Sequence, residues 1–265
     1  MDRIADYQLL AALAANEHGR FFLARPPARL GRPEELVVVK VVGGSTEVAF
    51  RRFTRELQAF AAVASPYLVP VYDAGQQADT FFYAMEHAPL GTLAAPAEAL
   101  DAAAARRALR HAALAAHALH EAGVAHRNIT PAAVWLHPGG AKLADLGLAH
   151  LIEAGGSMTS LTTAGAVEWV DPALIRGDAP SRASDIYSLG AVLHFALTRR
   201  PIFGDLPTDN AAMAIRRVLR EAPDLDPALE PADRALIAAC LAPDPTDRPA
   251  TAAQLADRLA EAGGA

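Results

Sequence analysis

Histidine and cysteine are the side chains whose clustering most clearly indicates a site for a transition metal, often completed by a carboxylate. There are nine histidines and a single cysteine, Cys240. His111, His117 and His120 fall on one alanine-rich stretch, where helical spacing would let them share part of a face. A zinc site takes four ligands, and no cysteine pair or carboxylate pattern accompanies these histidines. We therefore expect ordinary structural or surface histidines and no metal site.

The composition excludes several classes of function. The net charge is −6 with no basic stripe, which argues against binding of nucleic acid. One cysteine cannot form a disulfide framework within the chain. No run reaches the roughly 18 apolar residues of a membrane helix, and the first residues lack a signal-peptide pattern. We expect a cytoplasmic chain, or the cytoplasmic part of a larger, membrane-linked protein.

The hydrophobic pattern changes along the chain. Short strand-like runs fill the first ninety residues or so, at 21–23, 36–42, 68–72 and 81–85. One helix interrupts them, where Phe50, Phe53, Leu57 and Phe60 recur at helical spacing. Helical stretches follow at 100–122, 184–198, 209–220, 231–241 and 251–262. A strand-rich part followed by a helical part predicts the α+β class.

Several short motifs stand in a fixed order along the chain. They are Val37-Val38-Val39-Lys40, Arg55-Glu56-Leu57, Ala84-Met85-Glu86-His87, His126-Arg127-Asn128-Ile129-Thr130-Pro131-Ala132-Ala133, Asp145-Leu146-Gly147, Asp171-Pro172-Ala173, Ser184-Asp185-Ile186-Tyr187-Ser188-Leu189-Gly190 and Asp244-Pro245-Thr246-Asp247-Arg248-Pro249. Together they cover nearly the whole chain. This ordered set resembles the eukaryotic-like Ser/Thr protein kinases of actinobacteria.

The resemblance implies a fold and a nucleotide site. The fold would be one bilobal kinase-like domain, with a small antiparallel-β N-lobe and its helix C at 1–88 and a mainly helical C-lobe at 89–262. The residues that persist at the family's binding positions are Lys40 for phosphate, Glu56 for its helix C partner, Asp145 for metal, Gly19 of the phosphate loop, and Met85, Glu86 and His87 of the hinge.

Three residues differ from the catalytic residues that this family uses for phosphate transfer. Asn128 stands where the family has the catalytic Asp, and an amide has no basicity near neutral pH. Thr130 replaces the loop Lys that contacts the γ-phosphate, and Ala133 replaces the second metal ligand. We therefore expect no catalytic residues and no enzyme: the prediction is a pseudokinase without a cofactor.

The adenine slot also differs from the family pattern. Phe21, Val38 and Trp135 fall at positions where the family has small or aliphatic residues. We expect Trp135, with Phe21, to fill the adenine volume, so that ATP binds weakly or not at all. The alternative is that Trp135 turns into the C-lobe. The persistence of Lys40, Glu56 and Asp145 has two interpretations: residual nucleotide binding without turnover, or a structural bridge from Lys40 to the two carboxylates without a ligand.

Arg248 is the family's partner of a glutamate that is Ala173 here. The sequence leaves open whether Arg248 is solvated or pairs elsewhere.

The segment between Gly147 and Pro172 is rich in hydroxyl groups. Thr159, Ser160, Thr162 and Thr163 are candidate phosphorylation sites for an active Ser/Thr kinase, and a phosphothreonine there would recruit a forkhead-associated domain. The plainer interpretation is a polar loop.

The resulting hypothesis is a catalytically inactive signalling scaffold or regulator that binds protein partners. The alternatives are an ATP-binding pseudokinase switch, or an unconventional Ser/Thr kinase of low activity.

Overall fold

The computed structural model describes residues 3–16, 19–32, 35–43, 47–145, 167–207 and 209–262. These residues form two compact units. The first holds residues 3–62 and 69–88, and the second holds 63–68, 89–145 and 167–262, within the described ranges. The predicted order, a strand-rich part and then a helical part, is confirmed.

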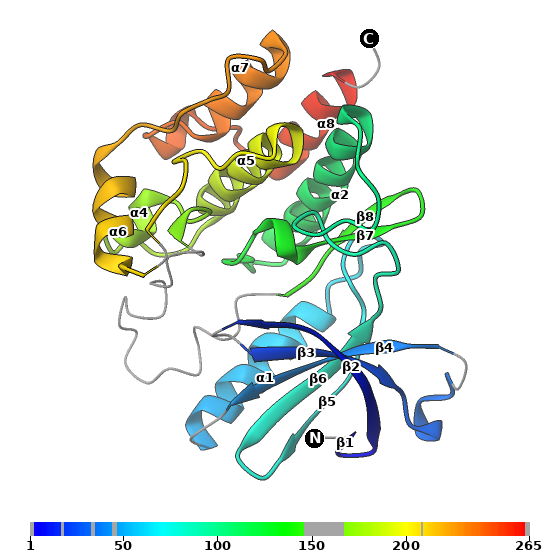
Figure 1. Ribbon diagram of the computed structural model, residues 1–265. Coiled ribbons are helices and arrows are strands. Elements are labelled where there is room, and N and C mark those ends of the chain that lie inside the picture. Colours follow the sequence, from blue (N-terminus) through cyan, green and yellow to red (C-terminus); the bar gives the residue numbers. More distant parts are fainter. Residues whose placement is uncertain are drawn as a thin grey trace. The chain divides into compact units, whose positions relative to one another are not determined.

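The first unit is built on a six-stranded antiparallel sheet in the order β1-β2-β3-β4-β6-β5 (Figure 1). The strands are β1 (Arg3–Ile4), β2 (Tyr7–Asn16), β3 (Gly19–Arg25), β4 (Val37–Gly43), β5 (Val71–Gln77) and β6 (Thr80–Glu86). A short 3-10 helix, η1 (Ala28–Leu30), follows β3, and α1 (Glu47–Ala61) follows β4.

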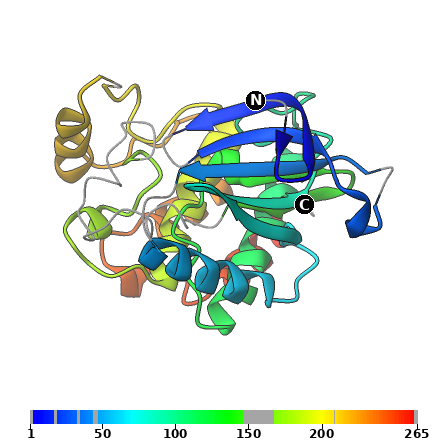
Figure 2. The same ribbon diagram turned by 90° about the horizontal axis from the view of Figure 1, so that it is seen from below.

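The central strand β4 explains why this sheet forms. Its valines are buried on both faces, because each face is covered. Helix α1 lies on one face of the sheet (Figures 1 and 2). There Phe53 of α1 stacks on Phe81 of β6, with the ring centroids 5.7 Å apart. On the other face Phe82 meets Tyr7 edge-on at 5.8 Å. The alternation of Phe81 and Phe82 sends neighbouring side chains into two separate apolar clusters.

The sheet curls until its two edges meet. β1 and β5 are the outermost strands, yet Tyr7, at the start of the neighbouring β2, donates its hydroxyl to Asp73 of β5 at 2.7 Å. Arg29 binds both Asp73 and Asp6. The curl encloses the cluster that includes Ile4, Tyr7, Val39 and Phe82.

The second unit is mainly helical (Figures 1 and 2). Its elements are α2 (Ala102–Glu121), η2 (Pro131–Ala133), β7 (Val134–His137), β8 (Gly140–Leu143), α4 (Pro172–Ile175), α5 (Arg182–Thr198), α6 (Ala211–Arg220), α7 (Pro231–Cys240), η5 (Pro245–Asp247) and α8 (Ala252–Ala262). Helix α5 lies at its centre, since residues 184–194 are all buried. The predicted helical stretches are therefore confirmed as α2, α5, α6, α7 and α8.

Helix α5 begins and packs as its sequence dictates. Ser181 and Ser184 form a reciprocal capping box at its first turn. Gly190 allows close approach of α7, because an added Cβ would lie 2.5 Å from Cβ of Cys240. Within the described ranges, no helix combines the length and apolar character needed to cross a membrane.

Candidate functional site

Asp185 on α5 organises the loop at 126–133. Its carboxylate accepts hydrogen bonds from the backbone N–H of His126 at 2.7 Å and of Arg127 at 2.9 Å. The ring of His120, near the end of α2, contacts the same carboxylate at 2.8 Å. Arg127 has a φ of 69°, a conformation that a non-glycine residue keeps only when its surroundings impose it. Two helices therefore hold this loop through one buried carboxylate.

His126 joins the loop to the end of the β8 strand. Its Nε2 lies 3.0 Å from the carbonyl oxygen of Ala144, and its Nδ1 accepts from the backbone N–H of Asn128 at 3.4 Å. Burial lowers the pKa of His126, so the ring is neutral and Nε2 carries the proton.

Asn128 is held against Asp145. Its Nδ2 donates to the backbone carbonyl oxygen of Asp145 at 3.2 Å and lies 3.5 Å from a carboxylate oxygen of the same residue. These contacts fix the amide orientation, so Oδ1 of Asn128 remains as the acceptor. The backbone N–H of Ala144 also donates to the carbonyl oxygen of Ala133 at 2.8 Å. The structure thus brings Asn128, Ala133 and Asp145 together, as the motifs predict.

Thr130 and Ala133 have structural roles in this loop. The hydroxyl oxygen of Thr130 caps η2 by accepting from the backbone N–H of Ala133 at 3.3 Å. The methyl group of Ala133 is buried and offers no oxygen for a metal ion. The loop therefore keeps its local hydrogen bonds although Thr130 and Ala133 replace the family's lysine and second metal ligand.

In the first unit, Lys40 lies in the middle of β4 and is only 2% exposed. It stands opposite Phe21 of β3, and its ammonium lies 4.9 Å from the centre of the Phe21 ring. Val38 and Phe21 are buried as well, and Met85 is buried on β6. Glu56 is partly buried on α1, and burial lowers the pKa of His87.

Gly19 keeps the turn into β3 possible. Its φ is 134°, and an added Cβ would lie 2.6 Å from the carbonyl oxygen of Val41. Of the predicted phosphate loop, Glu17 and His18 lie outside the described residues.

Trp135 is 5% exposed and lies on β7, where its backbone pairs with Lys142 of β8 and with Thr92. The structure places it in the second unit, whereas Phe21 and Val38 belong to the first. That Trp135 and Phe21 fill an adenine slot stays a prediction.

The candidate phosphorylation sites Thr159, Ser160, Thr162 and Thr163, together with Leu146 and Gly147, lie outside the described residues.

Arg248 has a new partner. Its guanidinium binds the carboxylate of Asp171 with two nitrogens, and it also donates to the carbonyl oxygens of Ala183 and Ala242, both at 2.9 Å. The guanidinium lies over the ring of Tyr187. The side chains of Arg248 and Asp171 are both almost fully buried. Asp171 precedes α4 and caps it through the N–H of Ala173. This settles the question that the sequence left open.

Two of these roles were missed from the sequence. The sequence predicts an ordinary histidine at position 120, but its ring contacts the carboxylate of Asp185, which holds the loop at 126–133. His111 accepts from the N–H of Ala141 at 3.2 Å and packs on Tyr67. In the described part of the chain, no group of three or more His, Cys, Asp or Glu could hold a metal ion.

Glu168, just before α4, gives a test of pH dependence. Burial, and to a smaller extent Asp205, raise its pKa to about 7, and its Oε1 is buried without a hydrogen bond within the described ranges. The folded state keeps this proton up to about pH 7, whereas the unfolded chain loses it near its usual pKa of 4.5. The wild type therefore loses stability as the pH rises through this window.

Glu168→Gln should remove that loss. We expect the variant to be more stable than the wild type by about 1–2 kcal/mol at pH 8, a value reduced for the partial exposure of the side chain. The difference should disappear at pH 4.5 and below. Urea unfolding at the two pH values checks this, and an equal difference at both would contradict it.

The comparisons with known proteins agree with the geometry. The family model described as "Protein kinase domain" matches residues 29–259. The chain is similar to the serine/threonine-protein kinase AfsK of Streptomyces coelicolor, with 32% identity over 98% of this chain and 33% of that protein. It is similar to the serine/threonine-protein kinase PknB of Mycolicibacterium smegmatis, with 32% identity over 94% of this chain and 41% of that protein. The chain thus spans a third to two fifths of these relatives.

A solved structure shows the same fold. The PknI kinase domain of Mycobacterium tuberculosis superimposes with a TM-score of 0.72, over 98% of this chain and 96% of that one, at 22% identity. The predicted class, an α+β kinase-like fold with an antiparallel sheet and a helical part, is confirmed.

One prediction is wrong. Because Asn128, Thr130 and Ala133 replace family residues, the sequence predicts that the chain is not an enzyme. The relatives that match along almost the whole chain are named serine/threonine-protein kinases, and this finding contradicts that expectation. The loop that carries the three replacements keeps its backbone hydrogen bonds to Asp185. By its family model, its relatives and its fold, the chain belongs to the eukaryotic-like Ser/Thr protein kinase family of actinobacterial type.

Proposed function

We propose that the chain transfers the γ-phosphate of ATP to Ser or Thr hydroxyl groups of protein substrates at a low rate. The observation that carries the proposal is the loop at 126–133. Asp185 holds its backbone, and Asn128 is fixed against Asp145. Phosphate transfer by kinases depends mostly on positioning and on neutralisation of charge, and an intact loop preserves the positioning.

The residues present fit ATP with one metal ion better than with two. Lys40 would contact the phosphates, and the carboxylate of Asp145 would bind Mg²⁺, as the family relationship implies. Ala133 offers a buried methyl group where an oxygen ligand would be needed. The metal ion would supply neutralisation of phosphate charge, and this chain would hold it with fewer ligands.

Asn128 can position the acceptor without acting as a base. Its Oδ1 is the acceptor left after Nδ2 has bonded to Asp145, so it can accept a hydrogen bond from a Ser or Thr hydroxyl. It cannot take up the proton, which would pass to water or to a phosphate oxygen. General-base catalysis contributes roughly 10²–10⁴ in rate, so its loss slows the reaction without abolishing it.

Two further expectations from the sequence belong to this proposal. The lobes at 1–88 and 89–262 act as one kinase domain, and Thr159, Ser160, Thr162 and Thr163 are targets of an active Ser/Thr kinase. A forkhead-associated domain would then read a phosphothreonine at one of these positions. Mass spectrometry of the chain after coexpression with such a kinase tests this; an unmodified segment would refute it.

Binding of ATP is the first requirement of the proposal. Mg²⁺-ATP at ten times its Kd should stabilise the wild type by about 1.4 kcal/mol in thermal unfolding. Lys40→Met should lose this shift, because Lys40 is the proposed phosphate ligand. Lys142→Met is the matched control, since Lys142 lies on β8 and should leave the shift unchanged. Equal shifts in both variants would contradict the assignment.

The proposal that Trp135 fills the adenine slot leads to a separate prediction. Trp135→Leu restores an aliphatic residue and should lower the Kd for ATP by about tenfold, because adenine no longer competes with an indole ring. Isothermal titration with Mg²⁺-ATP measures this. An unchanged Kd would mean that the Trp135 ring lies outside the slot, which was the alternative.

A further inference from the structure

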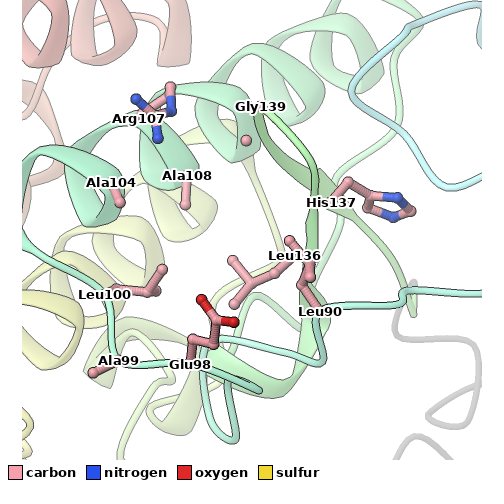
Figure 3. A pocket seen from close by; sticks show the side chains of 11 residues that line it. Leu90, Glu98, Ala99, Leu100, Ala104, Arg107, Ala108, Leu136, His137 and Gly139 are labelled. Atoms are coloured by element: carbon pink, nitrogen blue, oxygen red, sulfur yellow. The ribbon is translucent and has the colours of Figure 1, made fainter.

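A small cavity lies in the second unit, separate from the loop at 126–133 and from Asp145. It has a volume of about 170 Å³ and opens between the start of α2, the β7–β8 hairpin and the segment 90–100 (Figure 3). Its walls are mainly apolar, formed by Leu90, Leu100, Ala104, Ala108 and Leu136. Alanine at two successive turns of α2 leaves the space that larger residues would fill.

Two opposite charges stand at different sides of this cavity. In Figure 3 the carboxylate of Glu98 points into the cavity, whereas Arg107 lies beyond Ala104 and Ala108 on the α2 side. Both side chains are exposed, and neither makes a hydrogen bond or ion pair with any described residue. A carboxylate aimed into an apolar cavity favours a ligand that is cationic at one end and apolar along its length.

The volume restricts the ligand to a single side chain. Pockets for drug-sized molecules are roughly 300–1,000 Å³, and this cavity is well below that range. Lysine and arginine match both properties, because their methylene stems pack on apolar surface while the charged head reaches a polar partner.

We propose that this cavity binds one lysine or arginine side chain of a partner protein. The stem packs between Leu100, Leu136 and Ala108, and the cationic head pairs with Glu98. Arg107 would repel a cationic head on the α2 side of the cavity, so the head of the bound side chain lies on the side of Glu98. The interaction goes beyond phosphate transfer: it is a docking contact that uses none of the residues proposed to hold ATP or the acceptor hydroxyl.

The test uses a defined probe on the whole chain. N-acetyl-L-lysine methylamide carries the charge, and N-acetyl-L-norleucine methylamide has the same stem without it. Chemical-shift titration of the methyl groups of Leu100, Leu136 and Ala108 reports binding at this cavity. We expect saturable shifts with the lysine probe and about two- to fivefold weaker binding of the norleucine probe, as for an ion pair with an exposed carboxylate.

Two variants complete the test. Glu98→Gln should reduce binding of the lysine probe to that of the norleucine probe, whereas Glu261→Gln on α8, an exposed acidic residue elsewhere, should leave it unchanged. Ala104→Leu, at a partly exposed position of the wall, should block both probes. Equal binding of the two probes to the wild type would overturn the proposal, as would the absence of saturable shifts.

Discussion

Replacing Asn128 by Asp should raise the rate of phosphate transfer by roughly 10²-fold or more. The new carboxylate can accept the proton of the substrate hydroxyl, which the amide cannot. The loop that carries it is already in place, because Asp185 holds the backbone on the N-terminal side of position 128. Initial rates of labelled phosphate transfer at saturating Mg²⁺-ATP measure the effect.

Asn128→Asp should also lower the stability of the folded chain, for a reason that the contacts of Asn128 make clear. The amide of Asn128 donates to the carbonyl oxygen of Asp145, and a carboxylate cannot donate there. It would also stand near the carboxylate of Asp145, since the corresponding atoms are 3.5 Å apart. We therefore expect the variant to be less stable than the wild type without Mg²⁺ and to recover when Mg²⁺-ATP is present.

Asn210→Asp is the control for this experiment. Asn210 caps α6 through its side chain, and an aspartate caps equally well, so neither the rate nor the stability should change appreciably. An unchanged rate for Asn128→Asp, with folding intact, would show that the missing base is not what limits transfer.

Replacing Asp171 by Asn should destabilise the chain by about 3–5 kcal/mol. Arg248 is buried, and the asparagine would leave its charge without an anion. The remaining donations of Arg248 to Ala183 and Ala242 satisfy hydrogen bonds but do not neutralise the charge. Urea unfolding of the wild type and the variant at neutral pH measures the difference.

A control and a rescue separate the ion pair from other effects of this substitution. Asp178→Asn, at an exposed position shortly after α4, should change stability by only a few tenths of a kcal/mol. Adding Ala173→Glu to Asp171→Asn returns a carboxylate to the position where the family has glutamate, and it should recover part of the lost stability. A variant Asp171→Asn as stable as the control would refute the assignment of this pair.

The fold was predictable because its signals are strong and local. A run of valines indicated β4, and an apolar run that includes three successive aromatic residues indicated β6, both of which bury apolar side chains. Strand β2 was missed because it is rich in alanine and its residues 10–15 are exposed, so no hydrophobic pattern marks it. Strand β5 begins at Val71, later than predicted, and extends through a polar stretch that the pattern does not reveal.

The candidate site was predictable only as far as motifs reach. The positions of Asn128, Ala133 and Asp145 follow from the order of the motifs, and the structure brings them together. The partner of Arg248 depends on a contact between residues 171 and 248, which no local pattern encodes. The prediction that the chain is not an enzyme is contradicted by its relatives, which are named serine/threonine-protein kinases. Three side-chain identities in one loop do not carry that relationship, which rests on similarity along almost the whole chain.

The measurement that tests the central claim most directly is transfer of labelled phosphate from ATP by the purified wild-type chain. The acceptor would be a mixture of peptides that contain Ser and Thr, with Mg²⁺ present. We predict slow transfer that is lost in Asp145→Ala, while Asp178→Ala, at an exposed site after α4, retains it. No transfer above the level of Asp145→Ala, from a folded chain that binds Mg²⁺-ATP, would contradict the account.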